Sequence, residues 1–274
     1  MQPDRKSALS GAPQSIRAGP GTGTLGKLMS VLDLVVQADR PLRFTEILAV
    51  SDQPRGTLHR QLGHLVEEGL LELGGDLAYR PGLRLLNLAS RAWSQNDFRS
   101  VAEPHLRALN ELTGETVHLG VLRGTSIIYV DKVDGRQSAI RMYSQIGNAS
   151  PVYCTGIGKA ALSAMPDDAL GELVAQIRFS RFTAATHGDG AALLQDIGVI
   201  RRRGHAFDLE EHESGICCVA AAIRSQDPTF FAGISVTGPA YRVRFADLEG
   251  WAPHVRAAAA GIMKEMNGRL GPRR

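Results

Sequence analysis

The chain has 274 residues, 43% of them hydrophobic and 22% charged, and this ordinary globular composition suits two domains of unequal size. The formal net charge of +3 is mild, so a nucleic-acid interface would have to rest on a local arrangement of charges. The three cysteines, two of them adjacent, do not form a disulfide framework and are typical of a reducing compartment. No apolar run approaches the ~20 residues of a membrane span, so we expect a cytoplasmic protein without membrane contact.

The first part of the chain shows a tail, three helices and two strands. Residues 1–22 combine Gly, Pro, Ser, Ala and Arg without periodicity, and we expect a disordered tail there. Apolar residues at helical spacing then predict a first helix from Leu25, a short second helix near 44–48, and a third that begins at Pro54. Two short strands, 70–73 and 77–80, flank Gly74, Gly75 and Asp76, a hairpin turn of the type that needs positive φ.

Three short helices followed by a β-hairpin form a winged helix-turn-helix, which we assign to residues 23–81. The pattern of residues 82–97 predicts a linker helix between the two domains. The pattern then becomes mixed, and residues 98–270 predict a second domain of the α+β class, because runs of strands covered by helices favour an antiparallel sheet. Its predicted helices are 101–112, 159–165, 167–177, 193–203 and 247–270, the last with a break at Pro253, and its predicted hairpins join strand 116–122 to 127–133 and strand 217–223 to 231–237.

The third helix is the candidate DNA reader. Its apolar residues turn inward, and recognition helices enter the major groove by their N-terminal turn, where Arg55 and Thr57 lie. Arginine pairs with guanine or holds a phosphate. A threonine hydroxyl bonds to a base edge or to a phosphate, and the free amides of a first helical turn add a phosphate site. The candidate DNA-binding residues are Pro54, Arg55, Gly56, Thr57, His59 and Arg60. A winged helix also serves as a protein-interaction adaptor, and the residues alone leave that alternative open.

Six stretches stand out along the chain: PRGTLHRQL at 54–62, YRPG at 79–82, PVYCTGIGKA at 151–160, GHAFDLEE at 204–211, GICCVAA at 215–221, and ISVTGP at 234–239 followed by Arg242. In this order, over roughly residues 24–270, they resemble signatures of the IclR (isocitrate lyase regulator) family of transcription factors. The resemblance implies a sequence-specific regulator with a GAF-like effector domain. It also implies dimers, or dimers of dimers, that bind palindromic operators in double-stranded DNA.

Carried over residue by residue, the resemblance implies a pocket for a small-molecule effector, a small carboxylate or an aromatic acid of a catabolic pathway. The effector-binding residues would be Gly156, Ile157, Asp208, Cys218, Ser235 and Thr237. Backbone amides at Gly156 and Ile157, at the start of a helix, are suited to an anion. Ser235 and Thr237 lie two apart on a strand, so both hydroxyls point to one face.

Five positions depart from the family pattern. Ile157 stands where a small alanine is common, which should narrow or reshape the pocket, and Tyr153 replaces a common histidine. Gly56 stands where a serine hydroxyl often meets phosphate, so that contact is not carried over. Asp52 occupies a turn position where glycine is usual, and aspartate tolerates left-handed geometry better than most residues. Pro81 replaces a leucine at the exit of the wing.

Other chemistries fit the sequence less well. The segment around Gly158 and Lys159 lacks the earlier glycine and the following Ser or Thr of a nucleotide-phosphate loop. Residues 208–213 contain one histidine among carboxylates, and we predict a solvated acidic turn paired with residues 201–203 rather than a metal site. His118 is expected to be a structural histidine.

The adjacent cysteines are not expected to act as nucleophiles. Cys217 and Cys218 point to opposite faces if they lie on a strand, so only one can line a pocket, and Cys217 is expected in the core. No positioned histidine base is specified for either thiol. We therefore predict no catalytic residue, metal or cofactor. An enzyme built on the C-terminal domain is a further alternative.

Overall fold

The computed structural model describes residues 23–136, 144–225 and 227–269, and the tail expected at 1–22 lies outside them. The chain divides into two compact units that meet in the sequence between Gln95 and Asn96. Within the described residues, no helix is both long and apolar enough to cross a membrane.

The N-terminal unit is a winged helix-turn-helix, as predicted. Its elements are α1 (Gly23–Val36), β1 (Leu42–Arg43), α2 (Phe44–Val50), α3 (Arg55–Glu67), β2 (Leu71–Leu73), β3 (Ala78–Pro81) and α4 (Leu83–Ser94). The strands form an antiparallel sheet in the order β1-β3-β2, so the two-residue strand β1, which the sequence pattern did not reveal, completes the wing. The core of this unit includes Val31, Leu32 and Val35 of α1, Ile47 of α2, and Leu58, Leu62 and Leu65 of α3.

The hairpin turn of the wing differs from the prediction. Gly74, Gly75 and Asp76 do not adopt positive φ; Leu77 does, at 59°. The Leu77 amide donates to the Gly74 carbonyl at 2.9 Å, and the Asp76 carboxylate accepts the amide of Ala78 at 3.3 Å. A left-handed residue at the end of such a turn restores the strand twist, and here the strained position falls one residue after the glycines.

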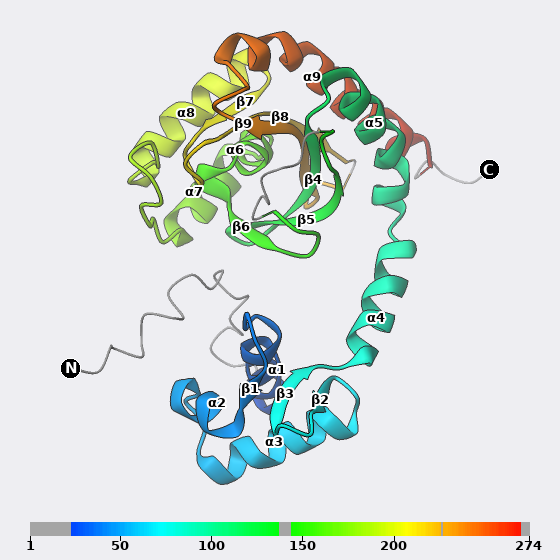
Figure 1. The fold of residues 1–274 in the computed structure, drawn as a ribbon. Helices are drawn as coiled ribbons and strands as arrows, with labels where there is room; N and C mark the ends of the chain where they lie inside the picture. Colours follow the sequence, from blue (N-terminus) through cyan, green and yellow to red (C-terminus); the bar gives the residue numbers. More distant parts are fainter. Residues whose placement is uncertain (1–22, 137–143, 226, 270–274) are drawn as a thin grey trace. The chain divides into compact units, whose positions relative to one another are not determined.

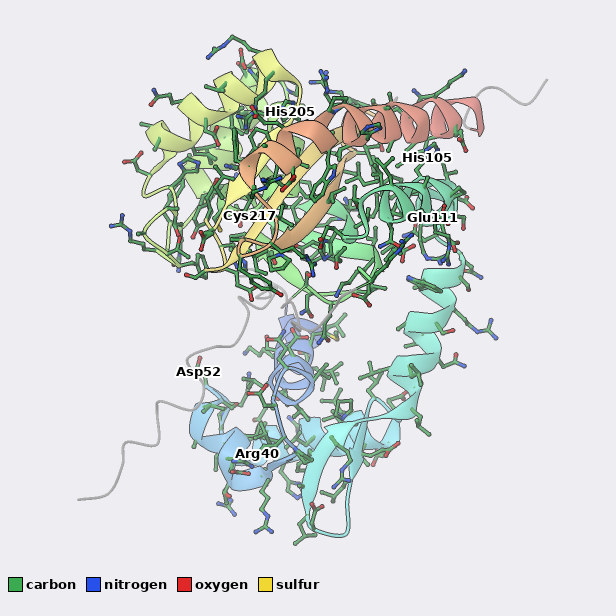
Figure 2. All side chains as sticks on the ribbon, turned by 45° about the horizontal axis from the view of Figure 1, so that its top comes forward. Arg40, Asp52, His105, Glu111, His205 and Cys217 are labelled. Atoms are coloured by element: carbon green, nitrogen blue, oxygen red, sulfur yellow. The ribbon has the colours of Figure 1, made fainter. Side chains whose placement is uncertain are left out.

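Asp52 is also not left-handed. Among the described residues other than glycine, only Leu77 and Glu210 have positive φ. Asp52, labelled in Figure 2, lies exposed in the link between α2 and α3. The link therefore needs no glycine, which explains why an aspartate is accommodated there.

The C-terminal unit is built around one six-stranded antiparallel sheet in the order β6-β5-β4-β9-β8-β7. The strands are β4 (Thr116–Arg123), β5 (Ser126–Val133), β6 (Ala149–Pro151), β7 (Ala206–Leu209), β8 (Ile216–Arg224) and β9 (Phe231–Pro239). The helices are α5 (Asp97–Thr113), the 3-10 helix η2 (Val152–Cys154), α6 (Gly156–Ser163), α7 (Asp167–Gln176), α8 (Gly190–Arg203) and α9 (Phe245–Arg269). The predicted α+β class is confirmed, and the edge strands β6 and β7 are additions to the prediction.

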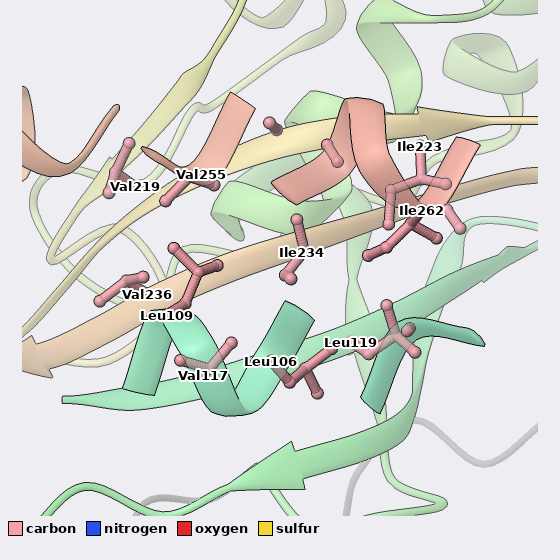
Figure 3. Close-up of a cluster of buried hydrophobic side chains, with 14 of the residues drawn as sticks. Leu106, Leu109, Val117, Leu119, Val219, Ile223, Ile234, Val236, Val255 and Ile262 are labelled. Atoms are coloured by element: carbon pink, nitrogen blue, oxygen red, sulfur yellow. The ribbon is translucent and has the colours of Figure 1, made fainter. Parts of the chain in front are cut away.

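Helices cover both faces of this sheet (Figure 1). On one face, α5 and α9 pack against β4, β8 and β9, where Leu106, Val117, Ile234 and Val255 belong to one apolar cluster (Figure 3). On the other face, α6, α7 and α8 form a second cluster with β5 and β8. The unit therefore has a core on each side of a central sheet, and polar groups on the sheet must find partners beneath the helices.

Two helix boundaries correct the prediction. Helix α9 runs from Phe245 to Arg269 without ending at Pro253, although proline lacks the amide donor that a helix interior uses. Pro253 is exposed, whereas Ala252 and Val255 on either side are buried against the sheet, and this packing holds the helix together. Helix α6 begins at Gly156, with the Thr155 hydroxyl accepting the Gly158 amide as its cap, so its first turn starts earlier than expected.

The apolar interior of α5 provides a stability test. We expect Leu106→Ala to lower the free energy of unfolding by roughly 2–5 kcal/mol, because Leu106 is fully buried and its truncation leaves a cavity. Leu112→Ala on the same helix is the control, since Leu112 is 55% exposed and its truncation should change stability by less than about 0.5 kcal/mol. Urea unfolding measures both, and equal losses would contradict the assigned core.

Candidate functional site

The six candidate DNA-binding residues lie together at the start of α3. Arg55 is the first residue of the helix and Pro54 its N-cap. Thr57 is half-buried and the other five are exposed, whereas Leu58, Leu62 and Leu65 face the core. The helix thus presents a polar first turn with free backbone amides, the arrangement that binds phosphate or base edges.

An aromatic contact that sequence analysis missed organises this turn. The Arg55 guanidinium carbon lies 5.4 Å from the ring centroid of Phe44, the first residue of α2, and the His59 ring meets the same phenyl ring edge-on at 5.8 Å. A cation over an aromatic face is attracted to it and loses freedom. Phe44 therefore orients Arg55 and His59 side by side. An aromatic residue opening the second helix was the available signal.

Gly56 of α3 and Arg80 of the wing are two further positions that bear on DNA contact. A Cβ atom added to Gly56 would meet no other atom within 4 Å, so a larger residue fits there without a clash. Arg80, at the base of the wing, pairs with Asp76 at 3.0 Å. Its charge is thus partly compensated within the wing.

The second site is a buried polar pocket on the face of the sheet that α6 covers. Its small cavity of about 50 Å³ is lined by all six candidate effector residues, Gly156, Ile157, Asp208, Cys218, Ser235 and Thr237. The strand register explains how they meet: Asp208, Cys218 and Thr237 form one cross-strand row over β7, β8 and β9. Ser235 lies in the adjacent row, directly opposite His118 of β4. A cavity of this size holds a few water molecules.

His118 is a pocket residue that sequence analysis treated as structural. Its Nδ1 lies 3.2 Å from Thr237 Oγ1 and its Nε2 lies 2.7 Å from Ser144 Oγ, while its ring is 5.3 Å from that of Tyr129. Complete burial, reinforced by the positive charge of Lys132, lowers the pKa of His118 to about 3. The imidazole is therefore neutral and offers the pocket one donor and one acceptor nitrogen.

Asp208 is the acidic group of the pocket. Burial, followed by the charge of Glu211, raises the pKa of Asp208 to about 7, although the carboxylate accepts the Glu211 amide at 2.8 Å. Burial also raises the pKa of the Cys218 thiol far above its usual value, so it is a poor nucleophile. As expected from strand alternation, Cys218 lines the pocket and Cys217 lies in the opposite core. Figure 2 labels Cys217 on β8.

Ile157 closes part of the pocket against two glycines. A Cβ atom at Gly120 would lie 3.2 Å from Ile157 Cγ2, and a Cβ atom at Gly233 would lie 3.0 Å from the same methyl group. Ile157 is 2% exposed and lines the cavity. Its branched side chain fits here because both facing positions on β4 and β9 lack side chains.

The prediction of a solvated acidic turn at 208–213 is wrong for Asp208 and Glu211, which are buried, whereas Glu210 is exposed. Glu211 is buried, and its Oε1 accepts a hydrogen bond from Lys159 Nζ at 2.5 Å. Two of the three arginines expected to pair with the turn have other partners: Arg201 pairs with Asp167, and Arg203 lies over the Phe207 ring at 4.5 Å. The local pattern could not reveal that a lysine of α6 would supply the compensating charge.

A winged helix-turn-helix and a sheet domain with a buried polar pocket, carried on one chain, define a transcriptional regulator. The model of the bacterial transcriptional regulator IclR C-terminal domain matches residues 90–264, and that of the IclR helix-turn-helix domain matches residues 24–74. The chain belongs to the IclR family of DNA-binding transcriptional regulators.

Individual relatives agree with this assignment. The HTH-type transcriptional regulator BhcR of Paracoccus denitrificans is 34% identical over 256 residues, which cover 93% of this chain and 89% of the relative. The crystal structure of Thermotoga maritima IclR matches 89% of this chain and 98% of its own, with a TM-score of 0.70 and 30% identity. An IclR homolog from Microbacterium hydrocarbonoxydans, complexed with 4-hydroxybenzoate, shares the fold with a TM-score of 0.72 at 23% identity, covering 89% of this chain and 99% of that one.

The neutral His118 generates a pH prediction. Its pKa is about 3 in the folded chain and about 6.5 when unfolded, so protons bind the unfolded state preferentially, and stability falls as pH drops below about 6.5. Lys132, Asp134 and the Tyr129 ring are the charged or titratable neighbours. Between about pH 7.5 and about pH 5, the wild type should lose about 2 kcal/mol more than His118→Gln. Urea unfolding at both pH values measures this difference, and parallel losses would show that His118 is not buried in a neutral state.

Proposed function

We propose that this protein acts in the cytoplasm as a sequence-specific regulator whose operator binding is modulated by a small carboxylate or aromatic acid. The observation that carries the proposal is the convergence of six residues, distant in the sequence, on one buried polar pocket in the family's effector domain. The effector shifts the regulator between DNA-binding states through its different affinity for those states.

The chemistry of the pocket favours an acid as the effector. The hydroxyls of Ser235 and Thr237 lie 3.3 Å apart and face the cavity beside the first turn of α6, whose amide groups favour negative charge. Asp208, with its raised pKa, supplies a carboxyl group that is partly protonated near neutrality. The 4-hydroxybenzoate bound by the Microbacterium homolog belongs to the same class of ligand. The small cavity means that an aromatic acid enters only if the pocket walls move.

The exposed face of α4 supports a homodimer. None of its residues is buried, and Leu83, Leu86 and Trp93, which helical spacing places on one face, are 40–74% exposed. An apolar helix face of this kind is covered when a second copy packs on it, and a two-fold dimer presents two copies of α3 to the two halves of a palindromic operator. A dimer of two such dimers uses further surfaces of the chain.

The DNA-binding surface is tested by two opposite changes at adjacent positions. Arg55→Ala should weaken operator affinity by roughly 1–3 kcal/mol, because it removes a base or phosphate contact. Gly56→Ser should strengthen it, since the added hydroxyl fits without a clash and points from the same exposed turn. Titration of a fluorescent operator fragment measures both, with Arg136→Ala in the C-terminal unit as the matched control. Unchanged affinity in both α3 variants would contradict the assigned recognition helix.

The effector pocket is tested by separating its size from its polarity. Ile157→Ala opens the space over Gly120 and Gly233, and should shift the preference toward 4-hydroxybenzoate over pyruvate by about tenfold or more. Ser235→Ala removes a hydroxyl from the pocket and should lower the affinity for any acid that the wild type binds. Isothermal titration calorimetry measures these affinities, and operator binding without effector should stay unchanged. The pocket assignment fails if both variants bind every acid as the wild type does.

A further inference from the structure

A cluster of ionisable groups outside the pocket joins three segments of the C-terminal unit. His187 lies in the segment between α7 and α8, Asp196 lies within α8, and Glu211 follows β7. One ligand atom from each lies within 4.8 Å of the others. Lys159 of α6 completes the cluster.

The separations between these atoms match those around a bound ion. His187 Nε2 lies 3.3 Å from Asp196 Oδ2 and 3.6 Å from Glu211 Oε2. The second distance is too long for a hydrogen bond. Ligands at roughly 2.1 Å from a tetrahedral Zn²⁺ lie roughly 3.4 Å from one another, so both distances are compatible with a shared metal, and in its absence His187 and Asp196 are joined by a direct hydrogen bond.

Glu211 supplies an independent observation. Its Oε2 is buried, and no described residue of the chain donates a hydrogen bond to it. The residue is only 7% exposed. A buried carboxylate oxygen without a donor is costly, and this one is directed toward the imidazole nitrogen of His187. A cation between them would satisfy both groups.

Lys159 fixes the carboxylates without saturating them. Its Nζ lies 2.7 Å from Asp196 Oδ2 and 2.5 Å from Glu211 Oε1, so Glu211 Oε2 stays available. Two carboxylates against one ammonium leave one net negative charge. The positive charge of the Lys159 ammonium weakens the attraction of the cluster for any cation. This disfavours ions that are held by charge and oxygen ligands alone, whereas the imidazole ligand favours Zn²⁺.

We propose that His187, Asp196 and Glu211 form a Zn²⁺ site, with water as the fourth ligand. His187 and Asp196 are about one-fifth exposed at their side chains, so an ion can reach the cluster from solvent. The ion ties the segment before α8 to the turn after β7. Because the Glu211 amide donates to Asp208, the site stabilises one wall of the polar pocket without entering it.

The test uses the full chain, stripped with EDTA, dialysed, and titrated with zinc chloride by calorimetry. We expect one ion per chain and a rise in the melting temperature upon addition of zinc. His187→Ala should weaken zinc binding at least about tenfold, because loss of even an outer-shell partner costs that much. His254→Ala, at an exposed histidine of α9, is the matched control and should bind zinc as the wild type does.

Cobalt substitution separates this site from binding at cysteine. Co²⁺ at the proposed ligands should give a tetrahedral d–d spectrum without a thiolate charge-transfer band, and the spectrum should disappear in His187→Ala and His187→Gln. Circular dichroism in EDTA checks that both variants fold. The proposal is overturned if the wild type binds no zinc, if His187→Ala binds it equally well, or if the cobalt spectrum shows thiolate ligation. Failure of the zinc proposal leaves the proposed DNA and effector binding standing, because neither requires the ion.

Discussion

The buried ammonium of Lys159 is the constraint on which the pocket side of the C-terminal unit depends. Lys159 is 1% exposed, and although burial opposes its charged form, Glu211 and Asp196 hold its pKa above the usual value. Removing one partner of such a pair typically costs about 3–5 kcal/mol, because the remaining charge stays buried. Lys159 thereby fastens α6 to α8 and to the turn after β7, and both α6 and that turn line the polar pocket.

The face assignments within the sheet were accessible from the sequence, because strand alternation is a local property. Alternation alone placed Ser235 and Thr237 on one face and separated Cys217 from Cys218, and the structure agrees. His118 could not be assigned to the pocket in that way. Its position depends on the pairing of β4 with β9, which brings together residues that lie 119 positions apart in the chain. No local pattern specifies such a register.

Burial and backbone geometry account for the other differences. The acidic segment near Glu211 looks solvated when its neighbours in sequence are considered, yet its counter-ion lies 52 residues away in α6. Helix α9 continues through Pro253 because tertiary packing outweighs one missing amide donor. In the wing, turn composition located the hairpin but not the strained residue, Leu77. Local chemistry therefore predicts the elements, whereas the partners of charged groups require the fold.

A β-bulge gives the proposed effector response a short physical route. The pairing of β4 with β5 shifts register between Leu119 and Gly120, so Tyr129 faces the pocket while Asp131 reaches the opposite side of the sheet. There Asp131 lies 3.1 Å from Arg99 Nε, in the first turn of α5. Strand β5 carries Tyr129 and, two residues later, Asp131, which ties the strand to α5. A ligand that displaces Tyr129 therefore acts on the helix that directly follows the N-terminal unit in the sequence. Such a displacement changes DNA binding only if the ligand favours one position of that strand over another, because differential affinity is the source of all coupling energy.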